Sequence, residues 1–269
     1  MRAWSLGELE LEMSDVDVSI EDQIAVVTLN RPMKRNSMTL AMWQEVATIF
    51  ESLGENPDTR VIILTGAGQN FSVGADVSEF AKVRSNAADA KAYEIAVDAS
   101  SNAIAGVPKP VIAVLEGYCL GGGCHLSMAC DFRYAHTAAS IGIPAAKLSI
   151  VYGIRSTQRL LALVGLTNAK RILYSGDRYC ASEAERMGFV DRVCVDPMAE
   201  AKEFAKQIAT LAPLSLQGAK WILTGLSMGA GGLDEAVAEA SIDAASDSED
   251  YKEARRAFAE KRAPIFLGR

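Results

Sequence analysis

The stretch Lys109-Pro-Val-Ile-Ala-Val-Leu-Glu-Gly-Tyr-Cys-Leu-Gly-Gly-Gly-Cys-His125 decides the fold of this chain. Residues 110–115 are an uninterrupted apolar run, which is typical of a strand that is buried on both faces of a parallel sheet. A glycine-rich turn follows the run, and a helix is predicted after the turn. Residues 60–65 and Gly66-Ala-Gly68 repeat this order of strand and glycine turn. The repetition predicts βαβ units and an α/β fold with right-handed crossovers.

The flanking sequence predicts the remaining elements by its periodicity. The alternating residues 16–20 and the run 23–30 indicate a hairpin that turns at Glu21-Asp22. Helical spacing predicts a helix over 39–53, capped by Ser37 or Thr39. The other expected elements are a helix over 87–105, a loop over 117–123, the start of a helix over 124–129, a strand over 132–135, and helices over 197–211, 213–225, 233–245 and 249–261, the last with Ser246 and Glu249 as a capping box. We therefore expect a lead-in over 1–15, a core over 16–196 and a C-terminal helical region over 197–269.

The composition of the 269 residues limits the classes of function. Hydrophobic residues make up 49% of the chain and charged residues 23%, as in an ordinary globular protein. The formal net charge of −7 argues against non-specific binding to nucleic acid, which needs a basic surface. No run of about 18 apolar residues and no signal peptide is visible, so we expect a cytoplasmic protein that does not span a membrane. The five cysteines are an odd number, so we expect no disulfide framework. Cys119, Cys124 and Cys130 lie in an apolar stretch with few His, Asp or Glu neighbours, so we expect buried thiols that act as small hydrophobic residues rather than a metal site.

Two glycine-rich turns stand between a predicted strand and a predicted helix. The first ends in Val73-Gly-Ala-Asp76 and the second contains Gly121-Gly-Gly123. Glycine lets a ligand approach the backbone closely, and N–H groups at the start of a helix have no partner within it. Two such turns side by side can therefore direct two N–H groups at one oxygen atom, as an oxyanion hole does. A phosphate-binding loop is the other possibility, but neither a following Lys-Ser/Thr pair nor a GxGxxG pattern is present.

Taken together, the motifs resemble the enoyl-CoA hydratase/isomerase (crotonase) superfamily. The similar segments are Asn30-Arg-Pro-Met-Lys-Arg-Asn36, Leu64-Thr-Gly-Ala-Gly68, Phe71-Ser-Val-Gly-Ala-Asp76, Lys109 to Gly117, Gly121-Gly-Gly-Cys124, Ala129-Cys-Asp131, Thr157-Gln-Arg-Leu160, Tyr174-Ser-Gly176, Ala184-Glu-Arg-Met-Gly-Phe-Val190 and Ala257-Phe-Ala-Glu-Lys-Arg262. The resemblance implies a crotonase-like spiral of ββα turns with a C-terminal helical trimerisation region. It also implies homotrimers, or hexamers that are dimers of trimers, with an acyl-CoA thioester as substrate and no separate cofactor.

The resemblance assigns roles to particular residues. The N–H groups of Ala75 and Gly122 match the pair that stabilises negative charge on the thioester oxygen, and the loss of one such donor costs roughly 10²–10³ in rate. Lys34 or Arg35 is expected to pair with a phosphate of coenzyme A. The complete set of expected contacts with coenzyme A is Lys34, Arg35, Ser72, Gly74 and Asp76, together with Phe258 and Lys261 from a neighbouring subunit.

The two glutamates of the family's hydratases are absent from the matching positions. A hydratase uses one carboxylate to activate water and another to deliver the α-proton, and each such group contributes about 10²–10⁴ in rate. His125 stands at the first position, and Ala145 in Gly142-Ile-Pro-Ala145 stands at the second. We therefore expect chemistry other than water addition by the two-glutamate mechanism.

Two side chains are candidates for the missing proton transfer. His125 titrates near neutrality, so it can act as base or acid, or it can be a buried histidine that bonds to the backbone. Tyr152 resembles the tyrosine of the branch that decarboxylates methylmalonyl-CoA-like substrates, or it is a packed aromatic residue. Arg155 is either an anchor for a substrate carboxylate or a surface charge. The alternatives are a hydratase or isomerase that uses His125, a decarboxylase or thioester hydrolase that uses Tyr152 or His125, and an inactive protein that only binds CoA esters.

Overall fold

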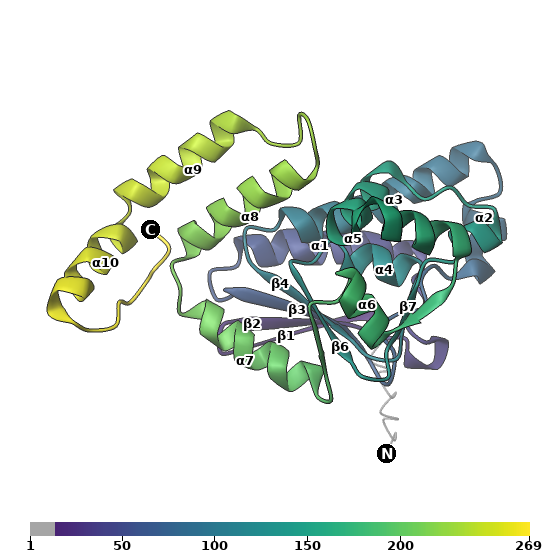
Figure 1. The fold of residues 1–269 in the computed structure, drawn as a ribbon, viewed down its shortest axis with the longest axis horizontal. Coiled ribbons are helices and arrows are strands. Elements are labelled where there is room, and N and C mark those ends of the chain that lie inside the picture. The colour runs from purple at the N-terminus through teal and green to yellow at the C-terminus, as the bar shows by residue number, and fades with distance from the viewer. Residues whose placement is uncertain (1–13) are drawn as a thin grey trace, which may run out of the picture.

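The protein is built around a six-stranded sheet, which the computed structural model describes within residues 14–269 (Figure 1). The strands are β1 (Val16–Glu21), β2 (Ile24–Leu29), β3 (Val61–Gly66), β4 (Val111–Leu115), β6 (Phe132–His136) and β9 (Arg192–Cys194). Their order is β1-β2-β3-β4-β6-β9, with β1 antiparallel to β2 and every other pair parallel. The predicted α/β fold and hairpin are confirmed, although the hairpin turns at Asp22 and Gln23, one residue later than expected. Residues 1–13 of the predicted lead-in lie outside the described part.

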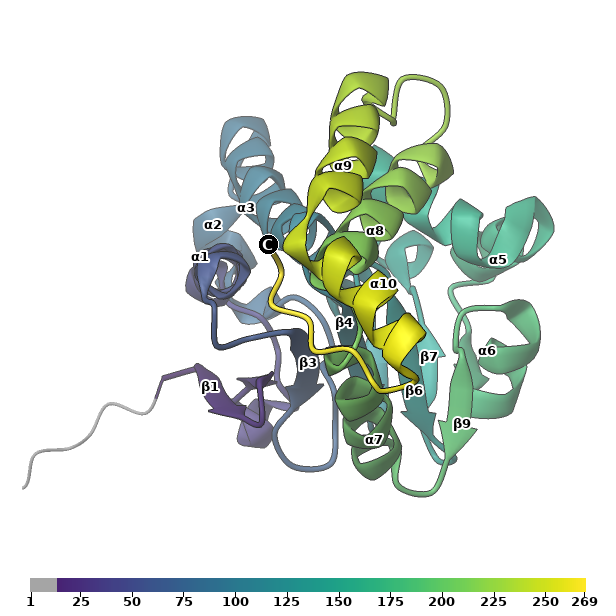
Figure 2. The ribbon, with the colours of Figure 1, turned by 90° about the vertical axis from the view of Figure 1, so that its left-hand side faces the viewer.

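Each face of the sheet has its own helical cover, because successive residues of a strand point to opposite faces. In β3, Ile62 and Leu64 pack into the large core with α1 (Leu40–Glu55) and α3 (Ala87–Gly106). The alternate residues Val61 and Ile63 pack against apolar side chains of α7 (Pro197–Ala209). Figures 1 and 2 show α7 on one side of the strands and α1 and α3 on the other. The continuous apolar run that predicted this strand therefore reflects burial on both faces.

The first helix begins where its sequence predicted. The Thr39 hydroxyl accepts a hydrogen bond from the Met42 N–H at 3.2 Å, so Thr39 rather than Ser37 caps α1. Trp43 and Phe50, which lie two turns apart on the same face, are both buried in the core. Trp43 on this face of α1 also borders the candidate site described below.

A second sheet of three short strands holds the second glycine-rich turn. It contains β5 (Tyr118–Leu120), β7 (Ser140–Gly142) and β8 (Arg178–Cys180) in that order. The prediction of a loop over 117–123 was therefore wrong for β5, because its three residues become a strand only by pairing with the distant β7. The helix that follows, α4 (Gly122–Ser127), begins two residues before the expected Cys124.

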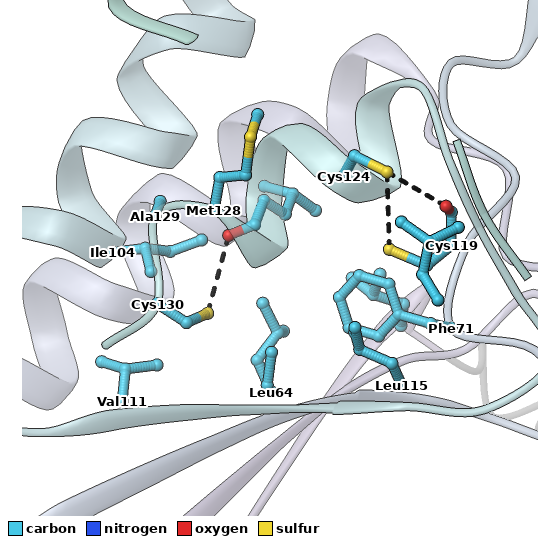
Figure 3. Close-up of a cluster of buried hydrophobic side chains, with 14 of the residues drawn as sticks. Leu64, Phe71, Ile104, Val111, Leu115, Cys119, Cys124, Met128, Ala129 and Cys130 are labelled. Atoms are coloured by element: carbon cyan, nitrogen blue, oxygen red, sulfur yellow. Dashed lines mark hydrogen bonds between the residues drawn. The ribbon is translucent and has the colours of Figure 1, made fainter. Parts of the chain in front are cut away.

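The cysteines of this region are small buried hydrophobic residues, as predicted. Cys119, Cys124 and Cys130 lie in the apolar layer between β4 and α4 (Figure 3). The Cys124 thiol donates to the carbonyl of Cys119 at 3.0 Å. All five cysteines are free thiols.

The C-terminal region is helical, and much of it projects from the core (Figure 1). Its helices are α7, α8 (Pro213–Ser227), α9 (Glu235–Asp247) and α10 (Glu249–Glu260). The remaining helices belong to the core and are α2 (Phe80–Val83), α5 (Ile154–Ser175) and α6 (Ala181–Met187). The core also contains the short 3-10 turns Pro32–Lys34, Val77–Glu79 and Ala145–Leu148. The predicted capping box of α10 was wrong. Ser248 caps the helix by accepting from the Tyr251 N–H at 3.0 Å, whereas the Ser246 hydroxyl donates to Ile242 inside α9, which runs on to Asp247. Among residues 14–269, no helix is both long enough and apolar enough to cross a membrane.

Candidate active site

The two glycine-rich turns predicted from the sequence lie side by side. The Ser72 N–H donates to the carbonyl of Tyr118 at 2.9 Å, and the Leu120 N–H donates to the carbonyl of Ser72 at 2.9 Å. These bonds align the segment that precedes Ala75 with β5, which leads into Gly121 and Gly122. A β-carbon on Gly123 would lie 2.6 Å from the Ser72 carbonyl oxygen, so the turns meet without side chains between them.

Two backbone amides of these turns, those of Ala75 and Gly122, lie close together at the junction. Met38 donates to the carbonyl of Gly74 and accepts from the N–H of Asp76, both at 2.8 Å, in the pattern of a parallel bridge. Because this pattern uses the groups on either side of Ala75, the Ala75 N–H points away from Met38. A β-carbon on Gly122 would lie only 3.2 Å from the Ala75 nitrogen. Within residues 14–269, the N–H groups of Ala75 and Gly122 donate to no other group.

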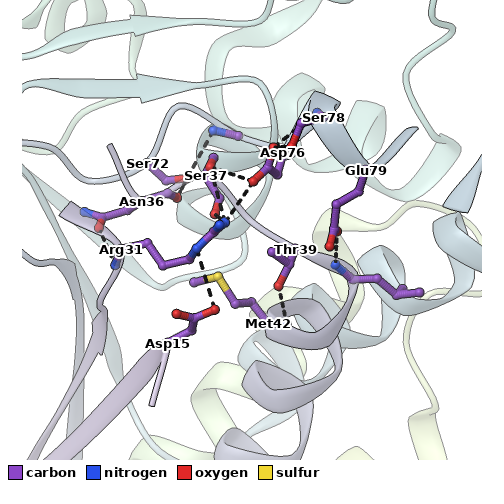
Figure 4. Close-up of polar contacts among 12 residues, drawn as sticks. Asp15, Arg31, Asn36, Ser37, Thr39, Met42, Ser72, Asp76, Ser78 and Glu79 are labelled. Atoms are coloured by element: carbon purple, nitrogen blue, oxygen red, sulfur yellow. Dashed lines mark hydrogen bonds and ion pairs between the residues drawn. The ribbon is translucent and has the colours of Figure 1, made fainter. Parts of the chain in front are cut away.

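Asp76 anchors the first turn to the segment after β2 (Figure 4). Its carboxylate accepts from the Arg31 guanidinium at 3.0 Å and from the Ser37 hydroxyl at 3.3 Å. It also accepts from the hydroxyl and N–H of Ser78, at 2.6 Å and 3.2 Å. Hydrogen bonds from Ser78, followed by Arg31, lower the pKa of Asp76 to about 2. The carboxylate next to Ala75 is therefore ionised and fully engaged within the protein.

The two amides border a cavity of about 150 Å³. Apolar side chains form most of its wall, and Val73, Phe80 and Val151 are among them. The polar or charged side chains of the wall are Arg84, Tyr93, Glu94, His125, Tyr152 and Ser156. Ala145 also lines the cavity, whereas Arg155 does not. A mostly apolar cavity with a few convergent polar groups is the usual form of a small-molecule site.

His125 reaches the cavity wall, but both of its ring nitrogens have partners. Nε2 lies 3.1 Å from the Val97 carbonyl, which can only accept, so Nε2 carries the proton. Nδ1 lies 2.6 Å from the Ser156 hydroxyl and accepts from it. Burial lowers the pKa of His125 to about 4. The ring is therefore neutral at pH 7, and it ties α4 to α3 and α5.

Tyr152 lies next to the second turn. Its hydroxyl donates to the carbonyl of Gly121 at 3.2 Å, and its ring meets that of His125 edge to face, with 6.4 Å between the ring centroids. Burial raises the pKa of Tyr152 well above its usual range, so the phenol stays protonated. The structure thus brings Ala75, Gly122, His125 and Tyr152 together at one cavity; their catalytic roles stay predictions.

Four polar residues of the wall, Arg84, Tyr93, Glu94 and Ser156, were not singled out in the sequence. The Tyr93 hydroxyl accepts from the Trp43 indole N–H at 2.8 Å, and burial raises the pKa of Tyr93 to about 12. Arg84 lies over the rings of Phe80 and Tyr93, 5.0 Å and 5.2 Å from their centroids, and forms an ion pair with Glu94 at 3.0 Å. The sequence carries only a weak signal for Tyr93 and Glu94, because the face of α3 that meets the cavity depends on how that Ala-rich helix packs, and Arg84 lies at the end of the short α2.

Some of the residues expected to contact coenzyme A have exposed side chains, and others are buried within the turn. Lys34 and Arg35 are exposed, and the Arg35 guanidinium lies 5.6 Å from the centroid of the Tyr118 ring. The Ser72 side chain is buried in the turn, where it donates to the Asn36 carbonyl at 2.7 Å and accepts from the Gly74 N–H at 3.1 Å. Ser72 and Gly74 therefore shape the turn, and a direct contact between the Ser72 hydroxyl and coenzyme A has no support here.

Two further residues expected at coenzyme A lie on the projecting C-terminal region. Phe258 of α10 is 87% exposed, and Lys261 ends that helix. Neither lines the cavity beside Ala75 and Gly122. Their contact with coenzyme A in a neighbouring subunit stays a prediction.

A larger cavity lies away from the two amides. It measures about 620 Å³ and lies between α7, α8 and the core, bordered by the ion pair of Lys220 and Asp131. Its walls are largely apolar and it contains neither Ala75 nor Gly122, so we assign the site to the smaller cavity. Among residues 14–269, no group of three or more His, Cys, Asp or Glu side chains is placed to hold a metal ion.

Comparison with known proteins agrees with this architecture. An enoyl-CoA hydratase from Bacillus anthracis of known structure superposes with a TM-score of 0.86 and 34% identity over 95% of this chain and 100% of that one. The short-chain-enoyl-CoA hydratase of Clostridium acetobutylicum is 34% identical over 259 residues, 94% of this chain and 97% of that protein. The (E)-benzylidenesuccinyl-CoA hydratase of Thauera aromatica is 33% identical over 268 residues, 94% of this chain and 99% of that protein.

These likenesses define a protein of the crotonase fold, as the sequence motifs implied. The family description "Enoyl-CoA hydratase/isomerase" matches residues 19–269. The chain belongs to the enoyl-CoA hydratase/isomerase family.

Proposed function

We propose that this protein binds an acyl-CoA thioester with the carbonyl oxygen between the N–H groups of Ala75 and Gly122. The observation that carries the proposal is that both amides are free of partners within residues 14–269 and adjoin the same cavity. A thioester carbonyl polarised in this way gives up a proton from the neighbouring carbon more readily, because the resulting enolate oxygen is stabilised where its charge develops.

The reaction that fits the cavity best is proton transfer on the acyl chain, on the isomerase side of the family. Water addition needs two proton-transfer groups at the matching positions, and His125 and Ala145 occupy them. Ala145 has no titratable group. His125 is neutral and bonded at both nitrogens, which argues against its use as an acid near pH 7.

Decarboxylation of a malonyl-type thioester is the second candidate. Loss of CO₂ leaves the same enolate on the thioester, and the reaction then needs a proton donor and no base. Tyr152 favours this candidate, because its protonated hydroxyl lies against the carbonyl of Gly121, beside the Gly122 amide.

The family resemblance also suggests how coenzyme A and the assembly are arranged. Exposed Lys34 and Arg35 are available to pair with its phosphates, and Phe258 and Lys261 of a neighbouring subunit would cover its adenine. We therefore propose a homotrimer or a hexamer. Sedimentation of the intact protein as a monomer would contradict this arrangement.

The proposed function is tested with a panel of CoA thioesters and mass spectrometry of the products. Saturated, 2-enoyl-, 3-enoyl- and malonyl-CoA are compared, with binding of each measured by calorimetry. The proposal predicts binding of thioesters and conversion of 3-enoyl-CoA to 2-enoyl-CoA. Turnover of malonyl-CoA alone would favour decarboxylation, and binding without any turnover would identify a CoA-ester binding protein.

A further inference from the structure

We propose that Glu94 is the catalytic group that moves the proton on the acyl chain, in place of the carboxylates that the family's hydratases carry elsewhere. The inference rests on the proposed function, because it requires a thioester held at Ala75 and Gly122. Nothing in the sequence motifs assigns a role to this residue.

Among residues 14–269, Glu94 is the one carboxylate that lines the cavity beside the two amides. It lies on α3, one helical turn before Val97, whose carbonyl accepts from the His125 ring. Residues three apart on a helix share a face, and Glu94 and Val97 both line the cavity. The carboxylate thus reaches the cavity from α3, whereas His125 reaches it from α4.

The Glu94 carboxylate is held by one oxygen and available at the other. Oε1 pairs with Nη1 of Arg84 at 3.0 Å, and no partner of Oε2 is found within residues 14–269. Arg84 is itself fixed by the rings of Phe80 and Tyr93, on which its guanidinium lies. A base whose position is set by a second group is the usual arrangement in proton-transfer sites.

The surroundings of Glu94 suit a group that both takes and returns a proton. Burial raises the pKa of the Glu94 carboxyl above its ordinary range, while the charge of Arg84 opposes that rise. A carboxylate with a raised pKa is a stronger base than one in water. The charge of Glu94 also contributes to the raised pKa of Tyr152, so the carboxylate acts electrostatically on the Tyr152 hydroxyl beside Gly121.

The proposed step transfers a single proton and needs no other reactant. Glu94 Oε2 takes a proton from the carbon next to the thioester carbonyl, and the C–H electron pair forms the carbon–carbon double bond of the enolate. The carbonyl π electrons move to the oxygen, where the N–H groups of Ala75 and Gly122 stabilise them. With a 3-enoyl substrate, the carboxylic acid returns the proton to the γ-carbon, so that the double bond ends at the 2-position and Glu94 is again ionised.

The experiment measures deuterium entering 3-butenoyl-CoA in D₂O by mass spectrometry, with binding of the thioester measured by calorimetry on the same preparations. The variants are Glu94→Gln, which keeps the shape and removes the charge, and Glu94→Asp, which keeps a carboxylate. Glu51→Gln is the matched control, because it makes the same change at an exposed position of α1 and Glu51 does not line the cavity.

We expect the wild type and Glu51→Gln to incorporate deuterium at equal rates. Glu94→Gln should slow the exchange by about 10²-fold or more with thioester binding unchanged, and Glu94→Asp should retain part of the rate. Exchange by Glu94→Gln at the wild-type rate would overturn the assignment, and so would a wild type that binds the thioester without exchange. A wild type that binds no thioester would instead overturn the proposed function itself.

Discussion

A β-carbon on Gly74 would lie 2.7 Å from the amide nitrogen of Gly122. It would lie equally close to the carbonyl oxygen of Leu120, and both atoms belong to backbone that a side chain cannot displace cheaply. Gly74 also has a φ of 91°, which L-residues rarely adopt. The glycine is therefore what allows the two turns to come close enough for their amides to share one ligand atom.

The first prediction is that Gly74→Ala separates the two turns. We expect at least about tenfold weaker binding of a CoA thioester and a loss in kcat/KM of roughly 10²-fold or more, because one N–H donor leaves its position. Calorimetry and steady-state kinetics measure the two effects. Gly106→Ala is the control, since a β-carbon at Gly106 meets no atom within 4 Å. Equal activity of the two variants would show that the close approach of the turns is not needed.

A second prediction concerns Arg31, which holds the turn from outside. Arg31→Met removes the bonds to Asp76 and to the Ser37 carbonyl, at 3.0 Å and 2.7 Å. We expect the Ala75 amide to shift and kcat/KM to fall by about tenfold, because small misplacements of catalytic groups are costly. Arg192→Met, which breaks the more exposed pair with Glu200, is the matched control and should leave kcat/KM unchanged. A loss of folding stability without any kinetic effect in Arg31→Met would contradict this role.

The third prediction is a pH dependence of stability that comes from His125. Its pKa of about 4 in the folded protein lies below the ordinary value of 6.5, so the unfolded chain binds more protons between these values. The free energy of unfolding should therefore fall as the pH drops from 6.5 toward 4, by roughly 3 kcal/mol from this residue. Urea unfolding of the wild type and His125→Gln at several pH values measures the difference. The variant should be less stable at pH 7 but show a shallower loss on acidification; an equal slope would contradict the account.

The fourth prediction concerns the bond between the C-terminal region and the core. Lys220 of α8 is buried and donates to the Asp131 carboxylate and to the Lys109 carbonyl, each at 2.9 Å. Lys220→Met removes both bonds and leaves the partly buried Asp131 carboxylate without a cation, with the Val111 N–H at 2.7 Å as its remaining donor, so we expect the free energy of unfolding to fall by about 2–3 kcal/mol. Thioester binding per folded molecule should not change, because Lys220 lies outside the cavity at Ala75. A stability equal to that of the wild type would show that the pair contributes nothing net.

Much of the fold could be predicted from local patterns in the sequence. The apolar run of β4 and the spacing in α1 each report burial directly, and both elements begin within one residue of their predicted start. The strand β5 could not be found in this way, because three residues in a glycine-rich segment pair with β7 only after the chain has folded. The same limit applies to Ser246, since the length of α9 decides which serine caps α10.

The candidate site also has features that local sequence patterns predict and features that depend on how distant elements pack. The placement of Ala75 and Gly122 at one cavity could be predicted from the glycine pattern and the family motifs, and their role as donors stays a prediction. The surroundings of His125 could not be assigned, because its partners Val97 and Ser156 come from two other helices. Glu94 was missed for a related reason: its position at the cavity depends on the rotation of α3, which the weakly patterned sequence of that helix does not fix.

The most direct test of the central proposal is the infrared spectrum of a bound thioester. Butyryl-CoA labelled with ¹³C at the carbonyl is added to the protein, and the carbonyl stretch is isolated by difference from the unlabelled ester. If the N–H groups of Ala75 and Gly122 hold the oxygen, the stretch shifts to lower frequency on binding to the wild type, and the shift is smaller in Gly74→Ala. A thioester that binds with its carbonyl frequency unchanged from that in water would contradict the proposal.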